Sequence, residues 1–205
     1  MKMKKLPGAS DLLVKPKTEL PIIAFKSQSD FRKWLTANHS KSNGIWLQFF
    51  KKDSGHVSIT YAQAVDEALC HGWIDGQAKK NDEKSWIQRF TPRRAKSIWS
   101  KRNIEHIERL TKEGKMTVTG HKAVEDAKQD GRWHRAYDSP AKMQVPEDFL
   151  KLLSKNKKAK AFFETLNKTN TYAIAWRLQT AVKPETKLKR MKAILEMLEK
   201  GEKFH

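Results

Sequence analysis

Strand-like patterns are confined to the first half of this 205-residue sequence, and helical periodicity dominates the rest. Short apolar runs at 21–25, 45–50, 73–75 and 86–90 predict four short strands, because polar or turn-forming residues bound each of them. After Pro92 the apolar residues recur at the three- and four-residue spacing of amphipathic helices. The pattern predicts an α+β fold that is helix-rich, with a small N-terminal β-sheet with helices and a C-terminal helical bundle.

Capping residues and glycines set the limits of the expected helices. Ser27 with Asp30, and Thr60 with Gln63, are typical pairs at a helix N-terminus, and Gly72 is a suitable stop for the second helix. The polar segment between the last two strands is expected to be a loop, and the helices after Pro92 are expected to end at glycines. The loop is expected at 77–85, and these helices at 97–113 and 118–130, with further helices beyond 146.

An irregular segment at 131–145 contains Pro140 and marks an expected boundary. We therefore expect three regions: a loose N-terminal arm at 1–20, an α+β domain at 21–140 and a C-terminal helical module at 141–205.

Basic residues outnumber acidic ones by 42 to 23, which gives a net charge of +19. The excess is spread along the chain, so it fits a lysine-coated surface or a polyanionic partner such as nucleic acid. A recognisable nucleic-acid reader motif is missing, as is an apolar run long enough for a transmembrane helix. Cys70 is the single cysteine, which excludes an internal disulfide and fits a reducing compartment. We expect a cytoplasmic protein that does not span a membrane.

Several motifs of catalysis and metal binding are missing from the sequence. It has no glycine-rich phosphate loop, His-Glu-x-x-His, Cys-x-x-Cys or Gly-x-Ser-x-Gly pattern, and its seven histidines lack metal-ligand spacing. We therefore assign no catalytic residue, no metal and no cofactor. Cys70 and His71 are neighbours in sequence, but adjacent helical residues point about 100° apart, so Cys70 is expected to pack as a small hydrophobe.

The segment 70–103 carries the strongest candidate for a functional site, because it places an acid, large aromatics and arginines at a junction of expected strands and a helix. Arg93 and Arg94 precede the expected helix start at Ser97, where free N–H groups stabilise anions and guanidinium groups match phosphate or carboxylate. Alternatively, Asp75 pairs with one of the arginines and the tryptophans belong to the core. The candidate ligand-binding residues are Trp73, Asp75, Arg89, Arg93, Arg94, Ser97, Trp99 and Asn103.

Several motifs along the chain form a combined pattern: Ala68-Leu-Cys-His-Gly-Trp-Ile-Asp75, Arg89-Phe-Thr-Pro-Arg-Arg94, Ser97-Ile-Trp-Ser100 with Asn103, Gly114-Lys-Met116, Asp130-Gly-Arg-Trp133, Pro146-Glu-Asp-Phe149, Trp176 and Glu185-Thr-Lys-Leu-Lys-Arg190. Together they resemble the YdeI/OmpD-associated (bacteriocin-protection) family. The resemblance covers roughly residues 22–201. The family label implies a protective role against cationic antimicrobial peptides and a link to an outer-membrane porin, and no established catalytic residues accompany it.

Three functions remain open from the sequence. The first is a non-enzymatic protection or envelope-stress protein that binds an anionic small molecule or protein partner through Arg89, Arg93 and Arg94. The second is a nucleic-acid-binding protein. The third is an enzyme that uses Asp75 or His71 as an acid–base group in a tryptophan-lined pocket.

Overall fold

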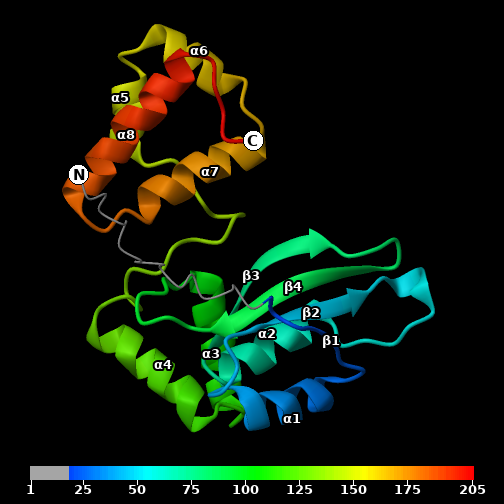
Figure 1. Cartoon of the computed structure of the whole chain (residues 1–205). Coiled ribbons are helices and arrows are strands. Elements are labelled where there is room, and N and C mark those ends of the chain that lie inside the picture. The colour runs from blue at the N-terminus through cyan, green and yellow to red at the C-terminus, as the bar shows by residue number, and fades with distance from the viewer. Residues whose placement is uncertain (1–18) are drawn as a thin grey trace, which may run out of the picture.

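The computed structural model describes residues 19–205, so the expected N-terminal arm at 1–20 lies almost entirely outside the described residues (Figure 1). Within that part of the chain, the α+β expectation is confirmed by a four-stranded sheet and eight α-helices. The first group of elements is β1 (Ile22–Ala24), α1 (Gln28–Asn38), β2 (Ile45–Phe50), a 3-10 turn (Lys52–Ser54), α2 (Tyr61–Cys70), β3 (Trp73–Lys80), β4 (Ser85–Pro92), α3 (Lys101–Lys112) and α4 (Val118–Gln129). The second group is α5 (Glu147–Leu153), α6 (Lys157–Glu164), α7 (Lys168–Gln179) and α8 (Pro184–Glu199).

The sheet has the strand order β1-β2-β4-β3, with β1 parallel to β2 and the other neighbours antiparallel. Helices α1 and α2 cover one face of it (Figure 1). Alternate residues of β2, namely Ile45, Leu47 and Phe49, are buried in the core between sheet and helices. The sequence predicted β2 from an apolar run bounded by turn-forming residues, and the structure adds the alternation of a strand with one covered face.

The helix caps predicted from the sequence are present. Ser27 accepts a hydrogen bond from the Asp30 N–H, and Thr60 forms a reciprocal capping box with Gln63. Gly72 follows α2 with φ of +72°, a left-handed conformation that glycine adopts without strain. The turn at Gly72 lets the chain enter β3 directly, which places Asp75 four residues after the cap residue His71.

The predicted loop at 77–85 is wrong, because β3 continues to Lys80 and pairs with β4 through Ala78–Gln88 and Lys80–Trp86. As the edge strand, β3 exposes polar side chains at 77–80 and therefore lacks the apolar alternation that marks a strand in a sequence. A register shift between Asp75 and Ala78 interrupts the pairing. Asp75 therefore lies at the irregular point of the edge strand.

The predicted start of the long helix at Ser97 is also wrong: α3 begins at Lys101, and Ser100 caps it by accepting from the Asn103 N–H. The preceding residues stay extended because Trp99 and Lys101 both hydrogen-bond to the backbone of Tyr137, over 3.0 and 2.8 Å. Tyr137 is far away in sequence, so this bridge is not visible in the local pattern.

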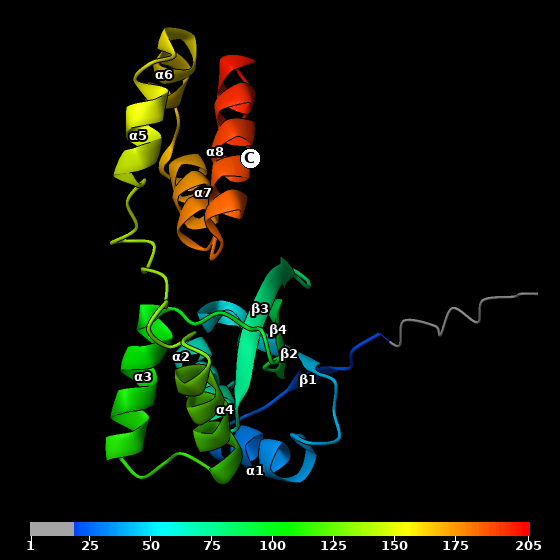
Figure 2. The ribbon, with the colours of Figure 1, turned by 90° about the vertical axis from the view of Figure 1, so that its left-hand side faces the viewer.

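Hydrophobic side chains form two clusters in the described residues. One joins the sheet with α1 to α4, and the other lies among α5 to α8 and the C-terminal residues. Figure 2 shows the two groups of elements at opposite ends of the molecule, joined by the irregular link at 131–145. Asp138 of this link and Gln179 of α7 hydrogen-bond to each other twice, over 2.6 and 2.8 Å. This pair ties the link to the C-terminal helices.

Candidate functional site: two neighbouring cavities

A cavity of about 340 Å³, the Asp75 cavity, lies where β3 meets the first turns of α2 and α3. Its polar lining includes Tyr61, Asp75, Ser100, Asn103, Tyr137 and Tyr172. These side chains come from α2, β3, the α3 cap, the link and α7, so segments far apart in sequence build it together. Two of the predicted site residues, Asp75 and Asn103, are among them.

Asp75 is held by hydrogen bonds and has no ion-pair partner among residues 19–205. The Tyr61 hydroxyl donates to Asp75 Oδ2 over 2.6 Å, and the Gln88 amide nitrogen lies 3.4 Å from the same oxygen. Burial and the hydrogen bond to Asp75 raise the pKa of Tyr61 well above its ordinary value, so the phenol keeps its proton. Asp75 is therefore an acceptor at a cavity wall, and the predicted alternative of a structural Asp75–Arg pair is not formed.

Arg93 and Trp99 form a stacked pair beside this cavity rather than a ligand clamp. The guanidinium carbon lies 3.5 Å from the centre of the Trp99 ring, and Arg93 Nη1 donates to the Ile98 carbonyl over 3.3 Å. Arg93 Nε, Arg93 Nη2 and Trp99 Nε1 are buried and have no hydrogen-bond partner within the described part of the chain. Burial lowers the pKa of Arg93 to about 10, so this side chain is still charged at neutral pH.

The other arginines of the predicted cluster have different surroundings. Arg89 is exposed on β4 and lies across Gly76, where an added Cβ would come within 3.2 Å of its Nε. Arg94 is exposed, and its backbone N–H donates to Ser97 Oγ. The predicted anion site at Arg93, Arg94 and Ser97 was placed ahead of a helix start, and α3 starts four residues later.

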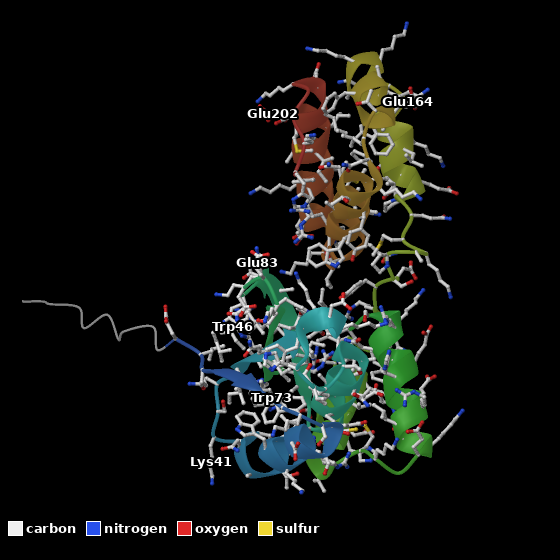
Figure 3. The ribbon with its side chains drawn as sticks, turned by 90° about the vertical axis from the view of Figure 1, so that its right-hand side faces the viewer. Lys41, Trp46, Trp73, Glu83, Glu164 and Glu202 are labelled. Atoms are coloured by element: carbon white, nitrogen blue, oxygen red, sulfur yellow. The ribbon has the colours of Figure 1, made fainter. Side chains whose placement is uncertain are left out.

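Trp73 belongs to the core, as the alternative interpretation of the tryptophans predicted. It is 1% exposed, donates its ring N–H to the His39 carbonyl over 3.2 Å, and packs edge-on against Trp34. Figure 3 shows Trp73 in the interior beside α1 and Trp46 on the outer side of the sheet.

His71 and Cys70 also lie in the interior, and neither lines the Asp75 cavity. His71 Nδ1 is 2.9 Å from the Glu67 carbonyl oxygen, and Nε2 is 3.3 Å from the Thr36 hydroxyl. Burial lowers the pKa of His71 and raises the pKa of the Cys70 thiol to about 11. The expected packing of Cys70 as a small hydrophobe is confirmed, and Asp75 and His71 do not share a cavity.

A second cavity, which we name the junction cavity, measures about 580 Å³. It lies between the segment before α3, the link that follows α4, and the end of α7. Its charged lining consists of Lys96, Lys101, Asp130, Arg132, Arg135 and Asp138. Sequence reasoning missed this site, although Asp130-Gly-Arg-Trp133 was one of the landmarks of the resemblance.

Both carboxylates of the junction cavity are already paired. Arg132 Nε lies 2.6 Å from Asp130 Oδ2, and Lys101 Nζ lies 2.6 Å from Asp138 Oδ1. Lys96 and Arg135 have no ion-pair partner among residues 19–205. The cavity therefore has an excess of positive charge, and two cations are available for an added anion.

Among residues 19–205, no group of three or more His, Cys, Asp or Glu side chains is arranged to hold a metal ion. None of the helices in that range has both the length and the apolar character required to cross a bilayer.

The fold places an α+β domain beside a helical module, with two cavities lined by residues from both. Comparison with family models assigns the parts separately. Residues 142–201 match the family described as "Bacteriocin-protection, YdeI or OmpD-Associated", which confirms the predicted resemblance for the C-terminal module. Residues 23–123 match a different model, a domain of unknown function (DUF8412), and this range contains the segment 70–103. No curated protein and no solved structure matches the chain.

Proposed function

We propose that this chain is a non-enzymatic binding protein that holds a small anionic molecule in the junction cavity. The observation that carries the proposal is the charge balance of that cavity, where four cationic side chains face two paired carboxylates. Guanidinium and ammonium groups that lack a carboxylate partner are suited to bind phosphate or carboxylate groups.

The position and shape of the cavity support the same proposal. Ligand sites are common where two structural units meet, and they combine apolar walls with a few polar groups. Ile98, Ala136 and Val182 provide apolar wall next to the charged side chains. The net charge of +19 also favours the approach of an anion from solution.

The proposal keeps the anionic ligand that the sequence predicted but changes the residues that bind it. Arg132, Arg135, Lys96 and Lys101 take the part that was expected of Arg89, Arg93 and Arg94. Arg132 also donates to the Ser97 carbonyl over 3.0 Å, so the predicted segment forms part of the wall of the site.

The family description of residues 142–201 names bacteriocin protection. We propose that a protective or envelope-stress role of this chain depends on binding an anion rather than on capturing a cationic peptide, because a net charge of +19 repels cations. The proposed location is the cytoplasm, as expected from the sequence.

Calorimetric titration with inorganic phosphate at low salt tests the proposal. The double variant K96A/R135A removes the two unpaired cations and is expected to weaken phosphate binding about ten-fold or more. The double variant K157A/K158A is the matched control, because it removes the same charge from exposed positions of α6 and should stay within about two-fold of the parent protein. Equal loss in both variants, or no phosphate binding by the parent, would contradict the proposal.

A further inference from the structure

The Asp75 cavity and the junction cavity share a wall. Ile98 and Tyr137 line both of them. Ile98 is 40% exposed, so part of its side chain is open to the cavities. Tyr137 is fixed there by its two backbone hydrogen bonds to Trp99 and Lys101. A molecule in one cavity therefore contacts side chains that also line the other.

The two cavities differ in what they can bind. The junction cavity offers unpaired cations and only paired carboxylates, whereas the Asp75 cavity combines Arg102 with a carboxylate that is not ion-paired within residues 19–205. A carboxylate repels a second anion but accepts hydrogen bonds from hydroxyl groups. Ser100, Asn103 and the tyrosines around it can donate or accept, so they suit a ligand with several hydroxyl groups.

A cationic group is less suited to the Asp75 cavity than a neutral hydroxyl. Arg102 lines this cavity, and Arg93 lies near enough for the charge of Asp75 to raise its pKa against the effect of burial. These two cations oppose an added ammonium group, whereas a hydroxyl group can use Asp75 as an acceptor without that repulsion.

We infer that the two cavities form one elongated site for a phosphorylated or carboxylated polyol, with the anionic group in the junction cavity and the hydroxyl groups in the Asp75 cavity. This inference rests on the proposed function, because it takes the junction cavity as the anion subsite. The aliphatic side chain of Ile98 then packs against the carbon chain between the two ends of the ligand.

Four probes test the inference by calorimetry under one set of conditions: inorganic phosphate, ribose, ribose 5-phosphate and phosphoethanolamine. Ribose 5-phosphate is expected to bind about ten-fold or more tightly than inorganic phosphate, because its hydroxyl groups gain hydrogen bonds to a charged acceptor. Ribose alone is expected to bind too weakly to detect.

The variant D75A is expected to remove the advantage of ribose 5-phosphate while leaving phosphate binding within about two-fold. In D75A the Tyr61 hydroxyl loses its acceptor, which could destabilise the fold. The double variant Y61F/D75A removes the donor and the acceptor of this hydrogen bond together, and it is expected to lose the same advantage as D75A. The control E83A removes a carboxylate from the exposed tip of the β3–β4 hairpin and should keep the advantage (Figure 3).

The outcomes separate the two ideas. If inorganic phosphate does not bind, the proposed function fails. If phosphate binds but ribose 5-phosphate binds no more tightly, or D75A keeps the advantage, the joined site is wrong and the anion site stands. If phosphoethanolamine gains over phosphate and ribose 5-phosphate does not, the Asp75 cavity recognises an amine, and the inferred polyol is overturned.

Discussion

The two cavities differ in the charges that they leave unpaired. In the Asp75 cavity the carboxylate of Asp75 is held by Tyr61 and has no cation bound to it within residues 19–205, and Arg102 lines the same cavity. In the junction cavity the carboxylates are paired, and the unpaired groups are cations. The difference teaches that the net charge of a chain does not indicate the chemistry of its sites, because local pairing decides which charges a ligand meets.

The largest expected effect is on stability, at Trp99, whose backbone carbonyl accepts a hydrogen bond from Tyr137 in the wall that the cavities share. Trp99 is 1% exposed, contacts the Trp133 ring at 5.0 Å between centroids, and supports the Arg93 guanidinium. We expect W99A to lower the free energy of unfolding by about 3–5 kcal/mol, because a buried aromatic is lost and a buried charge loses its stacking partner.

Chemical denaturation measures this loss. The control W46A changes the outer face of the sheet, where Trp46 is half-buried beneath Lys79. It should lower the free energy of unfolding by clearly less than W99A does. Similar losses for the two variants would show that Trp99 is not a central support of the shared wall.

Gln179 tests whether anion binding in the junction cavity depends on the C-terminal helices. Q179A breaks both hydrogen bonds to Asp138, a residue of the junction cavity whose carboxylate also binds Lys101. We expect phosphate to bind about three- to ten-fold more weakly, as the loss of about 1 kcal/mol per hydrogen bond implies. The control Q129A changes an exposed glutamine at the end of α4, and calorimetry should find its phosphate affinity unchanged.

His71 provides a pH test that separates stability from binding. Burial lowers its pKa in the folded state, so the unfolded chain takes up a proton first as the pH falls. The stabilising contribution is therefore complete above the ordinary histidine pKa of about 6.5 and is lost as the pH falls below it.

We expect the midpoint of urea unfolding to fall between about pH 7 and pH 5, and H71Q to show a smaller fall. Because His71 lines neither cavity, the ratio of phosphate affinities in H71Q and the parent should not change over that range. A change in that ratio with pH would place His71 in the binding site.

Arg94 gives the smallest expected effect. It is exposed and lines neither cavity, so R94A should leave the affinities for phosphate and ribose 5-phosphate within about two-fold. A ten-fold loss of affinity in calorimetry would instead support the anion site predicted from the sequence at Arg93, Arg94 and Ser97.

About one quarter of the predicted site residues were placed in a cavity, and the reasons differ from residue to residue. Asp75 was found because it is an acid in an apolar turn, and Asn103 because it belongs to the mixture of aromatic and polar residues in 70–103. Arg93 and Trp99 were both among the predicted ligand-binding residues, but the sequence could not show that they stack on each other. The junction cavity was missed because its cations come from separate segments that only the link and α7 bring together.

By itself, the sequence determined the elements whose signals are local. The capping residues Ser27 and Thr60, the turn at Gly72 and the apolar run of β2 depend on neighbours within a few residues. Only the tertiary structure decided the extra length of β3, the late start of α3 and the two cavities. Each of these depends on a partner distant in sequence: β4 for β3, Tyr137 for the residues before α3, and Gln179 for the link at Asp138. Backbone pairing and ion pairing between distant segments produce no local periodic pattern in the sequence, so only the three-dimensional structure shows them.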